Sequence, residues 1–258
     1  MNGRRTVIMA GLAVLASRAA GVAGPPATLA PGVLRVGTYF VNPPFEYLED
    51  GKEVGFEVDL MDEISRRLGL RPLYVNTRWE TILQEMEEHR YDCIVGGITI
   101  TKARERMLAW SVPYMVTTLS LVVNEVRTPG ITSLADMKEA TVGVQAATTD
   151  YDVAIVMRKK GEIGKIVVYP FDRIGDAMTD LEAGRITAVM KVAPVASYLA
   201  RETKGLRIVA EVPDDPQKLG IGFAKSETAL LTSVDAAIAS MRADGTLTRL
   251  ARRWGVPS

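Results

Sequence analysis

Short apolar runs alternate with amphipathic segments along most of this chain. The apolar runs predict strands, and the segments with an apolar stripe at helical spacing predict helices. The expected strands are 34–38, 73–75, 93–95, 119–123, 141–144, 166–169 and 188–191, and the expected helices are 57–68, 81–88, 173–182, 195–202 and 230–242. Such alternation predicts α/β units around mostly parallel sheets. We therefore expect an α/β fold.

The composition limits the classes of function. The 258 residues are 47% hydrophobic, so the chain can bury a large core and divide into two lobes. Lysine plus arginine equal aspartate plus glutamate at 31 each, so no global field attracts nucleic acid or an anionic membrane. The lone Cys93 excludes an internal disulfide and a cysteine-built zinc site, and its apolar run indicates a buried side chain. The lone His89 lies in a charged stretch where we expect it to be solvated. We expect no metal, no cofactor and no Ser/His/Asp or Cys/His catalytic set.

The N-terminus has the pattern of an export signal. Arg4 and Arg5 give a positive start, and residues 7–16 form an apolar run too short to anchor in a bilayer. Small residues then lead to a cleavage pattern at 21–23. We expect a signal peptide over 1–23 cleaved near Ala23, a leader over 24–32, and a periplasmic product. The arginine pair leaves the general secretory and twin-arginine routes both open.

One loop, residues 92–104, carries the groups that bind a carboxylate. The apolar run that begins at Cys93 ends in Gly96 and Gly97, and Thr99, Thr101 and Arg104 follow. Arginine binds a carboxylate with two parallel hydrogen bonds, and such charge-assisted bonds contribute about 1.5–3 kcal/mol each. The alternative is a glycine-rich turn with an N-capping threonine and a solvated arginine.

Five further segments favour the carboxylate-binding interpretation of this loop, because they occur in a characteristic order along the chain. They are 34–47 (LRVGTYFVNPPFEY), 54–60 (VGFEVDL), 107–114 (MLAWSVPY), 142–149 (VGVQAATT) and 243–255. Together they resemble the periplasmic solute-binding proteins of polar amino-acid ABC transporters, family 3 of the extracellular solute-binding proteins. The resemblance covers about residues 34–257.

The resemblance implies a type II periplasmic binding fold. Two Rossmann-like lobes are then joined by a two-strand hinge, with residues 33–119 and 223–258 in lobe 1 and residues 120–222 in lobe 2. The ligand is expected in the cleft between the lobes, at the carboxyl ends of strands. Closure of a monomer around a small carboxylate ligand would be the signal that an ABC permease in the inner membrane reads.

The resemblance also implies the residues that hold the ligand's carboxylate. In lobe 1 these are the Gly97 backbone, Thr99 and Arg104. In lobe 2 the segment that begins at Gln145 precedes a helix, and Thr148 and Thr149 at the helix start supply amides for an anion. Ordinary N-capping is the alternative for both threonines.

The same resemblance implies which residues form the walls of the pocket. Trp79 corresponds to an aromatic wall beside the ligand, with core packing as its alternative. Tyr39 and Asn42 line the side-chain end of the pocket. Phe45 and Tyr47 are expected to serve packing.

One position departs from the family pattern. Amino-acid-binding relatives carry an aspartate that neutralises the ligand's α-ammonium, and Val192 occupies its place here, with Lys191 beside it. A buried ammonium without a counter-charge costs several kcal/mol. Either Asp150 or Glu46 takes over that role, or the ligand lacks an α-ammonium. Lys191 either adds positive charge that suits a second acidic group or points to solvent.

The sequence therefore predicts the substrate-binding component of an ABC importer, which captures an amino acid or a derivative. The alternative is an enzyme, because residues 77–80 (TRWE) resemble the periplasmic cyclohexadienyl or arogenate dehydratases. Such an enzyme needs a general acid to protonate the departing hydroxyl. The corresponding positions, Val192 and Val195, are apolar. We therefore expect no enzymatic activity.

Overall fold

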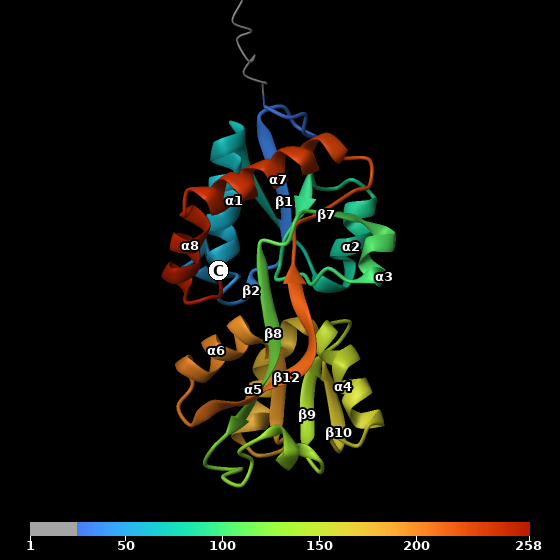
Figure 1. The fold of residues 1–258 in the computed structure, drawn as a ribbon, viewed down its shortest axis with the longest axis vertical. Helices are drawn as coiled ribbons and strands as arrows, with labels where there is room; N and C mark the ends of the chain where they lie inside the picture. Colours follow the sequence, from blue (N-terminus) through green and yellow to red (C-terminus); the bar gives the residue numbers. More distant parts are fainter. Residues whose placement is uncertain (1–24) are drawn as a thin grey trace, which may run out of the picture.

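The computed structural model describes residues 25–258, apart from the side chains of residues 214 and 215. Two five-stranded sheets with their helices form two lobes along the longest axis, and two long strands run between them (Figure 1). None of the helices within residues 25–258 combines the length and the apolar character that a membrane crossing requires. The expected signal peptide and its cleavage at Ala23 lie outside the described residues.

Lobe 1 is built on a sheet with the strand order β5-β1-β6-β13-β7. Strands β1, β5 and β6 are parallel, and β13 is antiparallel to both of its neighbours. Helices α1, α7 and α8 pack together on one side, and α2 lies on the other (Figure 1). The bounds are β1 Val33–Thr38, β5 Arg71–Asn76, β6 Cys93–Ile94, β7 Ala109–Trp110, β13 Gly222–Phe223, α1 Phe56–Leu68, α2 Trp79–Glu87, α3 Lys102–Met107, α7 Thr228–Ala243 and α8 Thr246–Trp254.

Lobe 2 is built on a sheet with the strand order β10-β9-β11-β8-β12. Strands β9, β10 and β11 are parallel, whereas β8 is antiparallel to β11 and β12. The bounds are β8 Met115–Asn124, β9 Thr141–Gln145, β10 Lys165–Tyr169, β11 Ala188–Val192, β12 Leu206–Leu219, α4 Thr149–Lys159, α5 Ile174–Glu182 and α6 Ala193–Glu202, with short 3₁₀ turns η1 Leu134–Met137 and η2 Phe171–Arg173.

Strands β8 and β12 form the hinge between the lobes. They pair antiparallel in lobe 2 and pair again at their far ends, where Leu219 lies opposite Met115. The register shifts twice along the pair, between Ile208 and Ala210 and between Val212 and Gln217. Each shift breaks the regular ladder and locally bends the strand.

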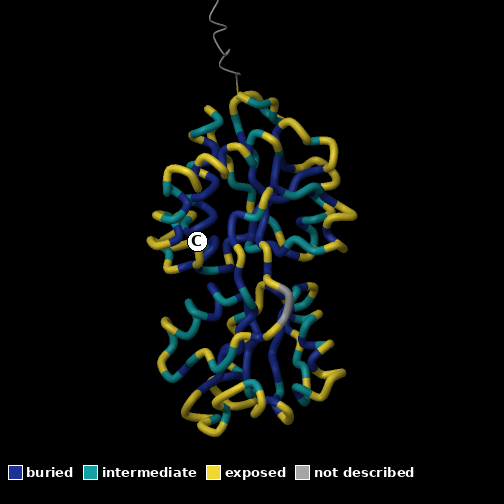
Figure 2. Tube along the Cα trace, viewed as in Figure 1, coloured by how far each residue is buried: buried dark blue, intermediate teal, exposed yellow. Residues whose placement is uncertain are grey.

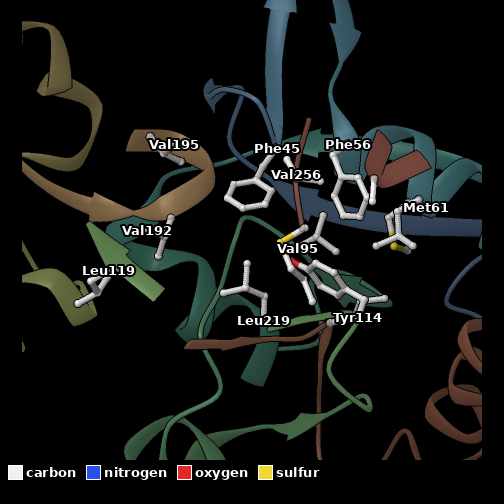
Figure 3. Close-up of a cluster of buried hydrophobic side chains, with 14 of the residues drawn as sticks. Phe45, Phe56, Met61, Val95, Tyr114, Leu119, Val192, Val195, Leu219 and Val256 are labelled. Atoms are coloured by element: carbon white, nitrogen blue, oxygen red, sulfur yellow. The ribbon is translucent and has the colours of Figure 1, made fainter. Parts of the chain in front are cut away.

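The apolar core runs through both lobes and the hinge. Phe45, Phe56 and Tyr114 are almost wholly buried in lobe 1, and one cluster connects them to Leu219 and to Val192 of lobe 2 (Figure 3). Burying such a side chain contributes about 1.5–3 kcal/mol. Exposed residues are concentrated on the outer helices and loops, while the sheet strands are mostly buried (Figure 2).

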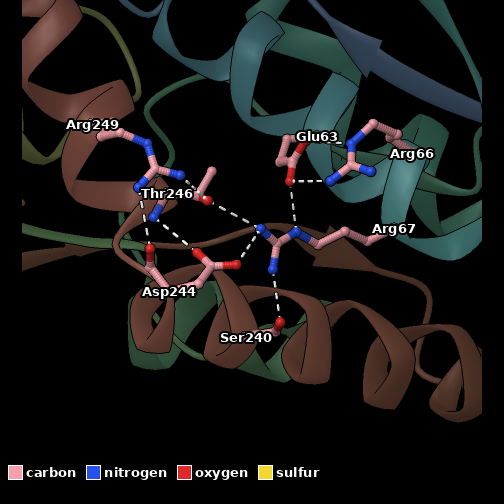
Figure 4. A network of polar contacts seen from close by, with 7 residues as sticks. All are labelled: Glu63, Arg66, Arg67, Ser240, Asp244, Thr246 and Arg249. Atoms are coloured by element: carbon pink, nitrogen blue, oxygen red, sulfur yellow. Dashed lines mark hydrogen bonds and ion pairs between the residues drawn. The ribbon is translucent and has the colours of Figure 1, made fainter.

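Polar contacts fix α1 against the turn between α7 and α8. Arg67 donates to Glu63 within α1 and to Asp244 at the end of α7, both at 2.7 Å (Figure 4). Arg67 also donates to Ser240 and Thr246. The guanidinium therefore joins the three helices of this face at one point.

The predicted α/β class and every predicted strand and helix are confirmed, with ends that differ by a few residues. Cys93 is buried, and the side chain of His89 is 47% exposed, as predicted. The predicted strands and helices did not include α3, α8, the two-residue strands β7 and β13, most of β12, or a small sheet of β2 (Val41–Asn42), β3 (Glu46–Glu49) and β4 (Lys52–Val54). The expected leader is held at Leu29, whose amide donates to Asp92 at 2.7 Å. The exact lobe boundaries stay a prediction.

Candidate functional site

A small cavity lies between the two lobes. Its free volume is about 30 Å³, which exceeds the roughly 10–15 Å³ that a cavity needs to hold one water molecule. The lining residues come from both lobes and are Tyr39, Asn42, Trp79, Gly96, Gly97, Thr99, Arg104, Thr148, Thr149, Asp150, Phe171, Lys191 and Val192. All the predicted ligand-binding residues except Gln145 therefore meet around one closed cleft.

The loop after β6 requires its two glycines. Gly96 has φ +155°, and a Cβ there would lie 2.4 Å from the ring of Tyr39. Gly97 has φ +61°, in the left-handed region. The Tyr39 hydroxyl donates to the Gly96 carbonyl, and Asn42 Nδ2 donates to the same oxygen at 3.4 Å. The predicted pair Tyr39 and Asn42 thus holds the loop as well as lining the cavity.

The Gly97 amide is engaged within lobe 1. It donates to Glu57 Oε1 at 2.8 Å, and the Tyr114 hydroxyl donates to the same oxygen. Glu57 and the neighbouring Glu46 are wholly buried, and burial raises the pKa of both carboxyls. In this closed form the Gly97 amide, predicted on the ligand's carboxylate, is therefore bonded to Glu57. Glu46 does not line the cavity.

Arg104 bridges the two lobes. Its Nη1 donates to the Thr99 carbonyl of lobe 1 at 2.8 Å, and its Nη2 donates to the Ala147 carbonyl of lobe 2 at 3.3 Å. The guanidinium carbon lies 4.9 Å from the ring centroid of Trp79, within the range of a cation–π contact. Thr99 Oγ1 donates to Gln217 Oε1 of the hinge at 3.1 Å. Burial lowers the pKa of Arg104 from its ordinary value, but arginine stays charged in proteins.

The start of α4 faces this arginine from lobe 2. Thr148 is the N-cap, since its hydroxyl accepts from the Tyr151 amide at 3.4 Å and donates to the Gln145 carbonyl at 2.6 Å. Thr149 begins the helix, where free amides and the helix dipole favour an anion. Capping and cavity lining therefore coexist at Thr148.

Lys191 points into the protein, so the alternative of a solvent-facing lysine is wrong. It is 4% exposed, and its ammonium donates to Gln145 Oε1. The same nitrogen lies 3.5 Å from Asp150 Oδ2 and 5.7 Å from the ring centroid of Phe171. Gln145 also donates from Nε2 to the Phe171 carbonyl. Gln145 thus supports Lys191 and Phe171 from behind the cavity.

Three aromatic rings, those of Tyr39, Trp79 and Phe171, pack together and line the cavity. Phe171 stacks on Trp79 at 5.1 Å between centroids and meets Tyr39 edge-on at 4.8 Å. Trp79 Nε1 donates to the Ala146 carbonyl of lobe 2 at 3.2 Å. Sequence reasoning missed Phe171 and Gly96 as lining residues. The only signal for Phe171 was its position just after a predicted strand.

The comparisons with known proteins agree with this architecture. The model of the bacterial extracellular solute-binding proteins, family 3, matches residues 34–257. The chain belongs to this family. The L-cystine-binding protein TcyJ of Escherichia coli (strain K12) is 29% identical over 224 residues, 86% of this chain and 82% of that protein. The ABC transporter arginine-binding protein 1 of the same organism is 24% identical over 226 residues, 86% of this chain and 90% of that protein.

Solved structures show the same fold. An ancestral arginine-binding protein bound to arginine is similar with a TM-score of 0.77 and 30% identity, over 86% of this chain and 98% of that one. An ancestral amino acid-binding protein described as a precursor of cyclohexadienyl dehydratase has a TM-score of 0.75 and 29% identity, over 86% and 95%. The fold is the type II periplasmic binding fold with two lobes, as predicted.

Proposed function

We propose that this protein is the substrate-binding component of an ABC importer, which captures a small carboxylate-bearing solute, an amino acid or a derivative, by closing its lobes. The proposal covers a monomer that is exported to the periplasm and delivers its ligand to an inner-membrane permease. Family membership and the cystine- and arginine-binding relatives support it. The observation that carries the site is Arg104, buried in the cleft and bonded to the main chain of both lobes.

The proposed mechanism follows from the position of these groups. In an open form the carboxylate binds Arg104 and Thr99 on lobe 1. On closure, the first amides of α4, at Thr149, reach the same carboxylate from lobe 2. The ligand then takes the place of the direct bond between Arg104 and Ala147 and links the same two lobes, so an anion that fits between them further stabilises the closed form.

Arg104→Ala is expected to abolish most ligand binding while leaving the fold intact, because it removes a bidentate charged donor. A thermal-shift screen of residues 25–258 against amino acids, opines, dicarboxylates and aromatic acids first finds the ligand. A ligand at 100 times its dissociation constant adds about 2.7 kcal/mol. Calorimetry then compares the variants. Arg106→Ala, an exposed arginine on the same short helix, is the control. Equal affinity of the two variants would overturn the site.

No enzymatic activity is proposed. Val192 and Val195, at the positions where the dehydratases carry acids, are 8% and 3% exposed and offer no proton. Incubation with prephenate and with arogenate is therefore expected to give no product above a blank. Turnover of either compound would restore the dehydratase alternative.

A further inference from the structure

The charged side chains that line the described cavity are two cations and one anion. Arg104 is 9% exposed, Lys191 4% and Asp150 2%. The wall beside Lys191 is apolar, formed by Val192 and Phe171. Two buried cations facing one anion leave an excess of one positive charge. Because buried charge is costly unless it is paired, a ligand with one net negative charge suits this cavity.

Lys191 already neutralises the anion. Its ammonium lies 3.5 Å from Asp150 Oδ2, which is beyond the usual length of an N–H···O hydrogen bond. A lysine ammonium has three donors, and the hydrogen bond to Gln145 uses one of them. The ammonium is thus held by Gln145 and Asp150 at the cavity wall with donor capacity for a ligand oxygen.

A ligand ammonium would meet a poor environment at the same place. It would have to share Asp150 with Lys191, so two cations would face one carboxylate in a buried cleft. Like charges at a buried site disfavour the charged forms of both groups. An oxygen acceptor on the ligand, in contrast, accepts a hydrogen bond from Lys191 and leaves the ion pair with Asp150 in place.

We propose that the ligand is a 2-oxo acid, with its carboxylate on Arg104 and the start of α4 and its keto oxygen on Lys191. This inference rests on the proposed function, because it names the class of carboxylate that the same cleft takes. It assigns Lys191 as the residue that selects a keto oxygen over an α-ammonium, with Gln145 and Asp150 positioning it.

Matched pairs of acids test the inference, since their members differ only at the carbon next to the carboxylate. Calorimetry compares 2-oxoisovalerate with L-valine, 2-oxo-4-methylpentanoate with L-leucine, and phenylpyruvate with L-phenylalanine. The oxo acid of the best-binding pair is expected to bind at least about tenfold more tightly. Equal or tighter binding of the amino acid overturns the inference and leaves the proposed function standing. No binding in these pairs or in the wider screen overturns both.

Variants at Lys191 test the residue itself. Lys191→Met is expected to lower the affinity for the oxo acid at least about tenfold. It should also reduce the difference in affinity between the oxo acid and the matched amino acid. Lys165→Met, which removes an exposed lysine of the same lobe, should change neither value. Because Lys191→Met leaves Asp150 unpaired, the double variant Lys191→Met/Asp150→Asn is used if the single variant fails to fold, since it removes one cation and one anion and so leaves the net charge of the cavity lining unchanged. An unchanged preference in the folded variant overturns the assignment.

Discussion

We expect the side chain at position 192 to affect how the cleft treats an α-ammonium. Val192 is 8% exposed and lines the cavity next to Lys191. Val192→Asp adds the counter-charge that a buried ammonium needs, and we expect L-amino acids to bind at least about tenfold more tightly. Calorimetry with the matched amino acids measures the change. Val192→Asn, which is polar but neutral, should give no comparable gain. If aspartate and asparagine act alike, the side chain at 192 does not meet the ammonium.

The buried carboxyl of Glu46 makes stability depend on pH. Burial first, and then the charge of Glu57, raises its pKa well above the ordinary value. In the unfolded chain the Glu46 carboxyl loses its proton at about pH 4.3, whereas in the folded protein it holds its proton to a higher pH. The unfolding free energy therefore falls as pH rises above the unfolded pKa.

Glu46→Gln is expected to remove this fall in the unfolding free energy at higher pH, because glutamine does not ionise. At about pH 8 the variant should be more stable than the parent by at least about 1 kcal/mol, with a much smaller difference near about pH 4. Urea unfolding at both pH values measures it. Glu49→Gln, an exposed glutamate on the same strand, is the control. A stability difference that does not vary with pH would contradict the prediction.

The orientation of Lys191 shows what the sequence leaves open at the residue scale. All five residues of β11 are buried, because the strand lies inside a sheet covered on both faces. Alternation along the strand therefore does not tell which side chain enters the cleft. The pairing of Lys191 with Asp150 was equally hidden, since the two come from different elements. Arg104 and Thr99 were predicted because they share one short loop with two glycines.

At the element scale, the start of α4 depends on its cap. Thr148→Ala removes the acceptor for the Tyr151 amide and is expected to lower the unfolding free energy by about 1 kcal/mol. It should also weaken ligand binding, because the amides at Thr149 lose their fixed direction. Denaturant unfolding and calorimetry measure the two effects. Thr148→Ser keeps the hydroxyl and should stay close to the parent. Equal losses in both variants would assign the effect to the methyl group instead.

The elements that the sequence missed have common physical causes. The strands of the small sheet and helix α3 are too short to show a period, so no pattern marks them. Strand β12 contains Pro213 and Pro216, which indicate a turn rather than a strand. The register shift between Val212 and Gln217 accommodates them. The longer parallel strands and their helices were predictable because each carries a clear apolar pattern.

At the scale of the whole molecule, hydrogen bonds across the cleft hold the lobes together. Trp79 donates to Ala146 and Arg104 donates to Ala147. Trp79→Phe keeps an aromatic ring but removes the hydrogen bond to Ala146, and such a bond contributes about 0.5–1.5 kcal/mol net. We expect the unliganded variant to have a larger radius of gyration than the unliganded parent, as measured by small-angle X-ray scattering. Trp110→Phe, in β7, should leave the radius unchanged. The same radius in both variants would show that the Trp79 bond does not hold the cleft shut.

The path of the chain through the hinge sets an order for folding. Lobe 2 and its hinge strands form one continuous stretch, from Met115 to Leu219, whereas the lobe 1 sheet needs β13 from beyond that stretch. Strand β7 has β13 as its neighbour in this sheet, so its backbone groups find that partner only after Gly222 has been synthesised and has docked. In a chain that emerges with its N-terminus first, lobe 2 can therefore complete its sheet before lobe 1, although lobe 1 contains the N-terminal strands.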